Sequence, residues 1–245
     1  MQWRNLHVFV ALILVSATAA GEPTLVLNNT NGPPFTTAQG DGFLDRVTQA
    51  AFARYGERVR LVMLPAERGL RSANAGIEDG DLTRIAGIEN VYPNLLPVPE
   101  KLMDWSFSAF SHKSAPTLSP GWDGLLPYRV GIIRGWKIAE TQLARAKGLV
   151  FVDDVEQLFR LLEKKRVDAV VYSREMGLWH LQQQKLKNIH LIEPPLDTRA
   201  MFIYLHKRHA ALAPKLAEAL RALKADGSYD RWYRESVTRK LAPAP

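Results

Sequence analysis

The 245-residue chain contains no cysteine. Disulfide bonds are therefore excluded, and so is the acylated cysteine that anchors a bacterial lipoprotein. Stability has to come from an ordinary hydrophobic core. With 47% hydrophobic residues, the chain is long enough to build one large domain or two smaller lobes.

The sequence has only one long hydrophobic run, VFVALILVSA, which follows Arg4 and precedes the small residues ATAA. A positive start, a short apolar run and small residues are typical of a secretory signal peptide. The run is shorter than the roughly 18 apolar residues that a membrane span requires. Residues 1–20 are therefore predicted to be a signal peptide cleaved near Ala20, and the mature protein is expected to be periplasmic, soluble and without a lipid anchor.

Several signatures of other functions are missing. The net charge is +7, but Lys and Arg are spread along the chain without a run of five or more, so no nucleic-acid partner is expected. Neither a G-x-S-x-G elbow nor a P-loop is present. His206 and His209 are the only close histidine pair and have no acidic or cysteine ligand nearby in the sequence. No metal, cofactor or catalytic residue is predicted.

Hydrophobic periodicity instead predicts alternating strands and helices. In the first half, Phe43, Val47 and Ala51 form a helical stripe between two short apolar strands, and Pro65 opens a second helix. The second half repeats this alternation. The predicted strands are 24–29, 58–64, 79–83, 128–133, 149–152, 167–173 and 199–207, and the predicted helices are 43–55, 65–75, 135–146, 153–165 and 174–184. This order predicts an α/β fold with parallel sheets.

Two stretches look like domain boundaries: the Ser-, Pro- and Gly-rich segment that begins near residue 112, and EPPLDT at 193–198. A complete α/β unit lies between them. We therefore predict that residues 21–111 form the first part of lobe 1 and that residues 112–197 form lobe 2. Residues 198–245 would return to lobe 1 and end in helices, so that two crossover segments would form a hinge beside an interlobe cleft.

Four stretches, taken in order, resemble bacterial extracellular solute-binding proteins of family 3, the polar-amino-acid-type periplasmic receptors. They are NGPPF with the following GFLDRVTQAAFARYG, then ERGLRSANAGIEDGDLTR, VFVDDVEQLFRLLEKKRVDAVVYSR and LKADGSYDRWYRE. The resemblance covers nearly all of the mature chain. It implies a monomer with the two-lobe, hinged type II periplasmic binding fold, in which the lobes close around a small solute.

The resemblance places residues 65–87 at the lobe 1 rim of the cleft. Arg84 would grip a ligand carboxylate, since a guanidinium can bind one with two parallel hydrogen bonds, and Arg68 could do the same. The alternative for Arg84 is a surface arginine paired with Asp81. Glu67 and Arg71 lie four residues apart and are expected to form an ion pair on a helix face.

Two further groups could face the ligand. Trp136 and Lys137 lie at a strand-to-helix turn of lobe 2, where free N–H groups favour an anion. The alternative is a solvated turn with Trp136 in the core. Asn29 and Phe35 follow the first strand, where parallel sheets place ligand contacts, although ordinary turn chemistry also explains this segment.

One feature departs from the family. Members that bind α-amino acids commonly carry an acidic residue after the strand that corresponds to DAVVYS, where it meets the ligand's amino group. This chain has Tyr172 and Ser173 there. An ordinary amino-acid ligand would need Glu67, Asp81 or Asp153 to supply the missing charge.

The expected function is therefore capture of a small polar, carboxylate-bearing and amino-acid-like solute for an ABC importer. One alternative is a ligand sensor that acts on a membrane signalling protein. Another is a periplasmic enzyme of the cyclohexadienyl dehydratase kind on the same fold, although no pair of a carboxylate and a base in the sequence indicates it.

Overall fold

The computed structural model describes residues 24–113 and 119–242, so the predicted signal peptide lies outside the described residues. The strands are β1 (Thr24–Asn29), β2 (Arg58–Met63), β3 (Gly80–Ile85), β4 (Leu95–Pro97), β5 (Met103–His112), β6 (Arg129–Ile133), β7 (Gly148–Val152), β8 (Ala169–Ser173) and β9 (Ile189–His206). The helices are α1 (Phe43–Ala53), α2 (Ala66–Asn74), α3 (Lys137–Gln142), α4 (Val155–Glu163), α5 (Arg174–Gln183), α6 (Ala213–Ala225), α7 (Ser228–Tyr233) and α8 (Arg239–Leu241).

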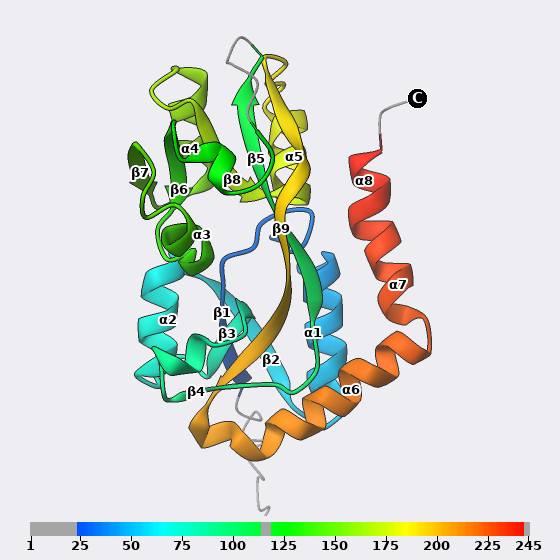
Figure 1. Ribbon diagram of the computed structural model, residues 1–245. Coiled ribbons are helices and arrows are strands. Elements are labelled where there is room, and N and C mark those ends of the chain that lie inside the picture. The colour runs from blue at the N-terminus through cyan, green and yellow to red at the C-terminus, as the bar shows by residue number, and fades with distance from the viewer. Residues whose placement is uncertain (1–23, 114–118, 243–245) are drawn as a thin grey trace, which may run out of the picture.

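The elements form two α/β lobes (Figure 1). Lobe 1 holds β1 to β4, the last part of β9, and helices α1, α2, α6 and α7. Lobe 2 holds β6 to β8 with α3, α4 and α5. The strand order is β2-β1-β3-β9-β5-β8-β6-β7, with β4 also paired to β9. The central strands of each lobe run parallel, as the alternating sequence pattern predicts.

Two long antiparallel strands, β5 and β9, run from one lobe into the other and pair with each other. Their register shifts at Ser108: Phe107 pairs with Asp197, whereas Ala109 pairs with Ile192. Residues 193–196, the Pro-containing stretch that looks like a boundary in the sequence, therefore bulge out of the ladder. The exact lobe limits at 112 and 197 stay a prediction, because both strands extend through the two lobes.

The predicted helical stripe in α1 is confirmed, since Phe43, Val47 and Ala51 are all fully buried. The helix predicted to begin at residue 135 is shorter than expected. Gly135 has a φ of 86°, which no right-handed helix accommodates, and Trp136 caps the helix from outside it. This turn directs residues 135–137 toward lobe 1.

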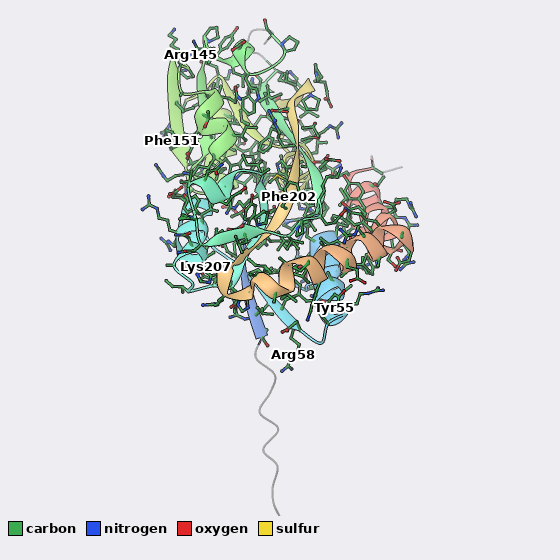
Figure 2. All side chains as sticks on the ribbon, turned by 60° about the horizontal axis from the view of Figure 1, so that its bottom comes forward. Tyr55, Arg58, Arg145, Phe151, Phe202 and Lys207 are labelled. Atoms are coloured by element: carbon green, nitrogen blue, oxygen red, sulfur yellow. The ribbon has the colours of Figure 1, made fainter. Side chains whose placement is uncertain are left out.

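The two lobes touch each other on both sides of β5 and β9. In Figure 1, α3 lies directly above α2. At the opposite side, the C-terminal segment reaches lobe 2, where Gln182 Nε2 of α5 donates to the Leu241 carbonyl at 3.3 Å. Figure 2 labels Phe151 on β7 of lobe 2 and Arg58 at the far end of lobe 1, with Phe202 on β9 between them. Nowhere in residues 24–113 and 119–242 does a helix have the length and apolar character needed to cross a membrane.

Candidate ligand-binding site

Two neighbouring cavities lie between the lobes and share Thr30 and Trp136 in their walls. We call the first the Arg84 cavity; it has a volume of about 40 Å³ and is lined by Thr83, Arg84, Trp105, Phe107 and Lys137, among others. We call the second the Tyr172 cavity; it has a volume of about 250 Å³ and is lined by Met63, Pro65, Asp153, Asp154 and Tyr172, among others. Both lobes contribute residues to each cavity, so closure of the lobes would enclose whatever lies there.

Arg84 lies at the wall of the first cavity, but its guanidinium is already paired. Nε and Nη2 donate to the two carboxylate oxygens of Asp81 at 2.8 and 2.9 Å, and Nη2 also donates to the Ala66 carbonyl at 3.2 Å. The pairing of Arg84 with Asp81 is confirmed, although the arginine is only 6% exposed and is not on the surface. Asp81 thus occupies the Nε–Nη2 edge of the guanidinium, one of the two edges through which an arginine can bind a carboxylate with two hydrogen bonds, and balances its charge.

The carboxylate of Asp81 is held in turn by β1. Asn28 Nδ2 donates to Asp81 Oδ2 at 2.6 Å, while the buried Asn28 Oδ1 has no partner in the described part of the chain. Gly69 of α2 packs directly on this amide, since a Cβ atom at that position would lie 1.9 Å from Asn28 Nδ2. Asp81, Asn28 and Gly69 together fix the distance between α2 and the end of β1.

Lys137 lies at the start of α3 and its ammonium is also neutralised internally. Its Nζ lies 2.5 Å from Glu67 Oε2 of lobe 1 and 3.2 Å from Glu140 Oε2. Glu140 Oε1 also accepts the Gly135 N–H at 2.7 Å. Two carboxylates of the protein therefore occupy the turn that the sequence suggests as an anion site.

These contacts shift the pKa values of Glu67 and Lys137 in the direction that favours their ion pair. Partial burial acts to raise the pKa of Glu67, but hydrogen bonds from Lys137 and Arg71 outweigh it and hold this pKa below its usual value. Burial acts to lower the pKa of Lys137, but Glu67 and Glu140 outweigh it and keep this pKa above the ordinary value. Arg71 lies 2.9 Å from Glu67, which confirms the predicted ion pair on α2.

Aromatic rings form the wall between the two cavities. Trp136 stacks on Tyr172 with ring centroids 5.1 Å apart and an interplanar angle of 8°. Trp105 and Phe107 of β5 meet Trp136 edge to face at 6.1 and 5.7 Å. Trp136 is 9% exposed, so it is both a core residue and part of the cavity wall, which combines the two alternatives for this turn.

The hydroxyl of Tyr172 makes no hydrogen bond within the described residues, although the residue is only 5% exposed. Burial raises its pKa well above the usual value, so the hydroxyl is neutral and keeps its proton. The buried Trp105 Nε1 likewise has no partner among these residues. Polar atoms of this kind beside a cavity offer hydrogen bonds to a bound molecule.

Three of the predicted site residues lie away from these cavities. Asn29 is buried and donates from Nδ2 to the Asn31 carbonyl and to Thr36 Oγ1, which stabilises the loop after β1. Phe35 is fully buried, with Trp105 at a ring distance of 5.4 Å. Ser173 is buried and caps α5.

Arg68 is exposed on α2 and lines a wider groove on the outside of the cleft, together with Arg134 and Asp153. The structure therefore brings Arg84, Asp81, Trp136, Lys137 and Tyr172 together and leaves Arg68 at the rim.

Four residues that the sequence does not predict also line the cavities: Thr30, Thr83, Trp105 and Phe107. The alternation of large apolar and small residues from 103 to 110 is the sequence signal that indicates the last two. No cluster of metal-binding side chains occurs within residues 24–113 and 119–242.

No family model matches the chain. An uncharacterised protein of Shewanella oneidensis is 28% identical over 204 residues, which is 76% of this chain and 72% of that protein.

Solved structures are similar over most of the chain. The GluR0 ligand-binding core in complex with L-glutamate has a TM-score of 0.77 and 14% identity, covering 89% of this chain and 99% of that one. A histidine kinase sensor domain with similarity to periplasmic binding proteins has a TM-score of 0.75, 18% identity and coverages of 86% and 95%. The substrate-binding protein of an amino acid ABC transporter has a TM-score of 0.72, 17% identity and coverages of 87% and 98%. The chain thus has the two-lobe fold of periplasmic binding proteins, and the solved structures it resembles include amino-acid-binding proteins of this type.

Proposed function

We propose that the protein is a solute-binding protein that holds one small organic molecule between its lobes, around Trp136. The observation that carries the proposal is the pair of cavities at this residue, whose walls come from both lobes on either side of β5 and β9. Hinged closure of two lobes is a common way to bury a ligand. The Tyr172 cavity approaches the roughly 300–1,000 Å³ of typical ligand pockets, which favours a small solute.

Binding explains the cavity walls better than catalysis does. Among the described lining residues, Arg84 and Lys137 are neutralised by carboxylates of the protein, and most of the other walls are apolar or aromatic. As far as the described residues go, neither cavity brings together a nucleophile, a general base and an orienting group. The similar solved structures are binding proteins, which supports the same role.

We further propose that the protein works in the periplasm and delivers its solute to an ABC importer. Support comes from the signal-like N-terminus and from the similarity to substrate-binding proteins of ABC transporters. Similarity to a sensor domain of a histidine kinase supports the second candidate, a receptor for a membrane signalling protein. Genes for a permease and an ATPase beside the gene for this chain would favour the importer.

A thermal-shift screen of the purified mature protein tests solute binding. The library should contain amino acids, organic acids, amines and polyamines. A molecule that binds only the folded state stabilises it by about 2.7 kcal/mol at a concentration of 100 times its Kd, which raises the Tm by several degrees in a chain of this size. Absence of any shift across the library would contradict the proposed function.

A further inference from the structure

The chemistry of the solute can be narrowed, because the charges of the two cationic side chains that line the Arg84 cavity, Arg84 and Lys137, are already balanced by carboxylates of the protein. Asp81 pairs with the Arg84 guanidinium through two hydrogen bonds. Glu67 and Glu140 form ion pairs with the Lys137 ammonium, and Glu140 also accepts a hydrogen bond from the Gly135 N–H. A ligand carboxylate at either side chain would add a second negative charge beside these carboxylates, or would displace one of them and leave it without its partner.

The Tyr172 cavity has the opposite electrostatic character. None of the described residues that line it is a lysine, an arginine or a histidine. Two of them, Asp153 and Asp154, are carboxylates. Asp153 has one distant cationic partner, Arg134 Nε at 3.5 Å. Asp154 has no cationic partner within the described part of the chain, where it accepts hydrogen bonds only from the neutral N–H groups of Gln157. A cation in this cavity would gain two carboxylate neighbours without displacing an internal ion pair from Arg84 or Lys137.

The rest of the wall suits the apolar part of such a cation. The stacked rings of Trp136 and Tyr172 present aromatic surface, and Met63, Leu64 and Val155 add aliphatic surface. A cation over an aromatic face is attracted by the negative charge of the ring face. The Tyr172 hydroxyl, which is more than nine-tenths buried and makes no hydrogen bond within the described residues, can accept a hydrogen bond from an ammonium group.

From these contacts we propose that the solute is a small organic amine: a cationic nitrogen on an apolar or aromatic body, without a carboxylate. The ammonium would lie by Asp153, Asp154 and the Tyr172 hydroxyl, and the body would pack against Trp136. This proposal rests on the proposed function, since it names the class of molecule that the same interlobe site binds. It replaces the carboxylate-bearing solute that the family resemblance implies.

Three probes that differ only in their charged groups test the proposal by calorimetric titration: phenethylamine, L-phenylalanine and 3-phenylpropanoate. L-Arginine and L-glutamate serve as further α-amino-acid probes. The amine should bind at least about tenfold more tightly than either carboxylate-bearing analogue, since Arg84 and Lys137 are already paired with protein carboxylates whereas Asp153 and Asp154 attract a cation. Equal or tighter binding of any carboxylate-bearing probe, or no binding of the amine, would overturn the proposal. The proposed function would fail separately, if no compound of the wider screen bound at all.

Two conservative variants locate the ammonium. Asp153→Asn with Asp154→Asn removes both charges, and Asn caps a helix as well as Asp does, so α4 is retained. The double variant should lose roughly tenfold or more in affinity for phenethylamine. Asp123→Asn, an exposed carboxylate elsewhere in lobe 2, is the matched control and should bind normally.

Tyr172→Phe keeps the ring that stacks on Trp136 and removes only the hydroxyl. It should weaken phenethylamine severalfold while binding of a neutral aromatic probe, benzyl alcohol, is less affected. Circular dichroism and unfolding curves of each variant separate a loss of affinity from a loss of fold. Unchanged phenethylamine affinity in a folded Asp153→Asn/Asp154→Asn protein would overturn the assignment of the amine to this cavity.

Discussion

Lys137 of lobe 2 and Glu67 of lobe 1 form an ion pair across the cleft, with Nζ 2.5 Å from Oε2. Lys137 is the first residue of α3 and Glu67 lies in the first turn of α2, on which the backbone of Gly135 packs. The side chains are 30% and 20% exposed, so solvent screens the pair only in part. This contact joins the two lobes directly. It should therefore favour the closed arrangement.

Removing the interlobe pair should shift the solute-free protein toward an open form. For Lys137→Met or Glu67→Gln, we expect the ratio of closed to open molecules to fall about two- to fivefold, since a partly exposed ion pair contributes up to about 1 kcal/mol. Small-angle scattering should show a larger radius of gyration. Arg71→Ala is the control, because Arg71 pairs with the same glutamate but lies within lobe 1 and is 75% exposed. An equal expansion in this control would contradict the role of the interlobe pair.

Closure should also depend on pH at both extremes. The pKa of Glu67 lies below 4.5 in the folded protein, so its contribution is present above about pH 4.5 and is lost as the pH falls through the lowered value. The pKa of Lys137 lies above 10.5, so its contribution is present below about pH 10.5 and is lost as the pH rises through the raised value. Scattering of the wild type should change in acid, whereas Glu67→Gln should show little change from this site. The same acid expansion in both proteins would assign it to other carboxylates.

Loss of Arg84 should lower the stability of the folded protein. Arg84→Ala leaves the Asp81 carboxylate buried without a cation, which costs about 3–5 kcal/mol. Denaturation with urea should show a lower midpoint with an unchanged slope. In the double variant Asp81→Asn/Arg84→Met, no unpaired charge is left, so much of the stability should return. A double variant as unstable as Arg84→Ala would show that the ion pair is not the cause.

Gly69 should tolerate no side chain. In Gly69→Ala the new Cβ would overlap the Asn28 amide, which Asp81 holds in place at 2.6 Å. Relief of the overlap requires α2 to move away from β1, so we expect a loss of about 1–3 kcal/mol in the free energy of unfolding. Gly32→Ala is the matched control, because a Cβ there meets no atom within 4 Å. Equal stability of the two variants would contradict the close packing of α2 on β1.

Much of the fold could be predicted from sequence, because each lobe is built from local periodic segments. The stripe in α1 and the short apolar strands β1 and β8 follow from spacing alone. The long crossover strands β5 and β9 cannot be predicted from local spacing in this way. The first half of β9 contains Pro194 and Pro195, which indicate a turn, and its pairing with β5 depends on residues far apart in the sequence.

The site was predictable only where partners are close in sequence. The pairs Arg84–Asp81 and Glu67–Arg71 lie three and four residues apart; the sequence predicts the second, and it offers the first only as the alternative to a ligand contact of Arg84. The burial of the Arg84–Asp81 pair cannot be predicted from the sequence, since it depends on α2 covering the end of β3. The partner of Lys137 lies 70 residues away in the other lobe, and no local pattern indicates it.

The distance between the lobes, measured with and without solute, tests the central claim most directly. The chain has no cysteine, so cysteines placed at the exposed positions Ala53 of α1 and Lys164 after α4 can carry two spin labels without background. Pulsed electron–electron double resonance gives the distribution of distances between the two labels. We predict a broad or bimodal distribution for the solute-free protein, and a single shorter distance once a solute identified by thermal shift saturates it. An identical distribution at saturation, with binding verified by calorimetry, would contradict closure of the two lobes around the solute.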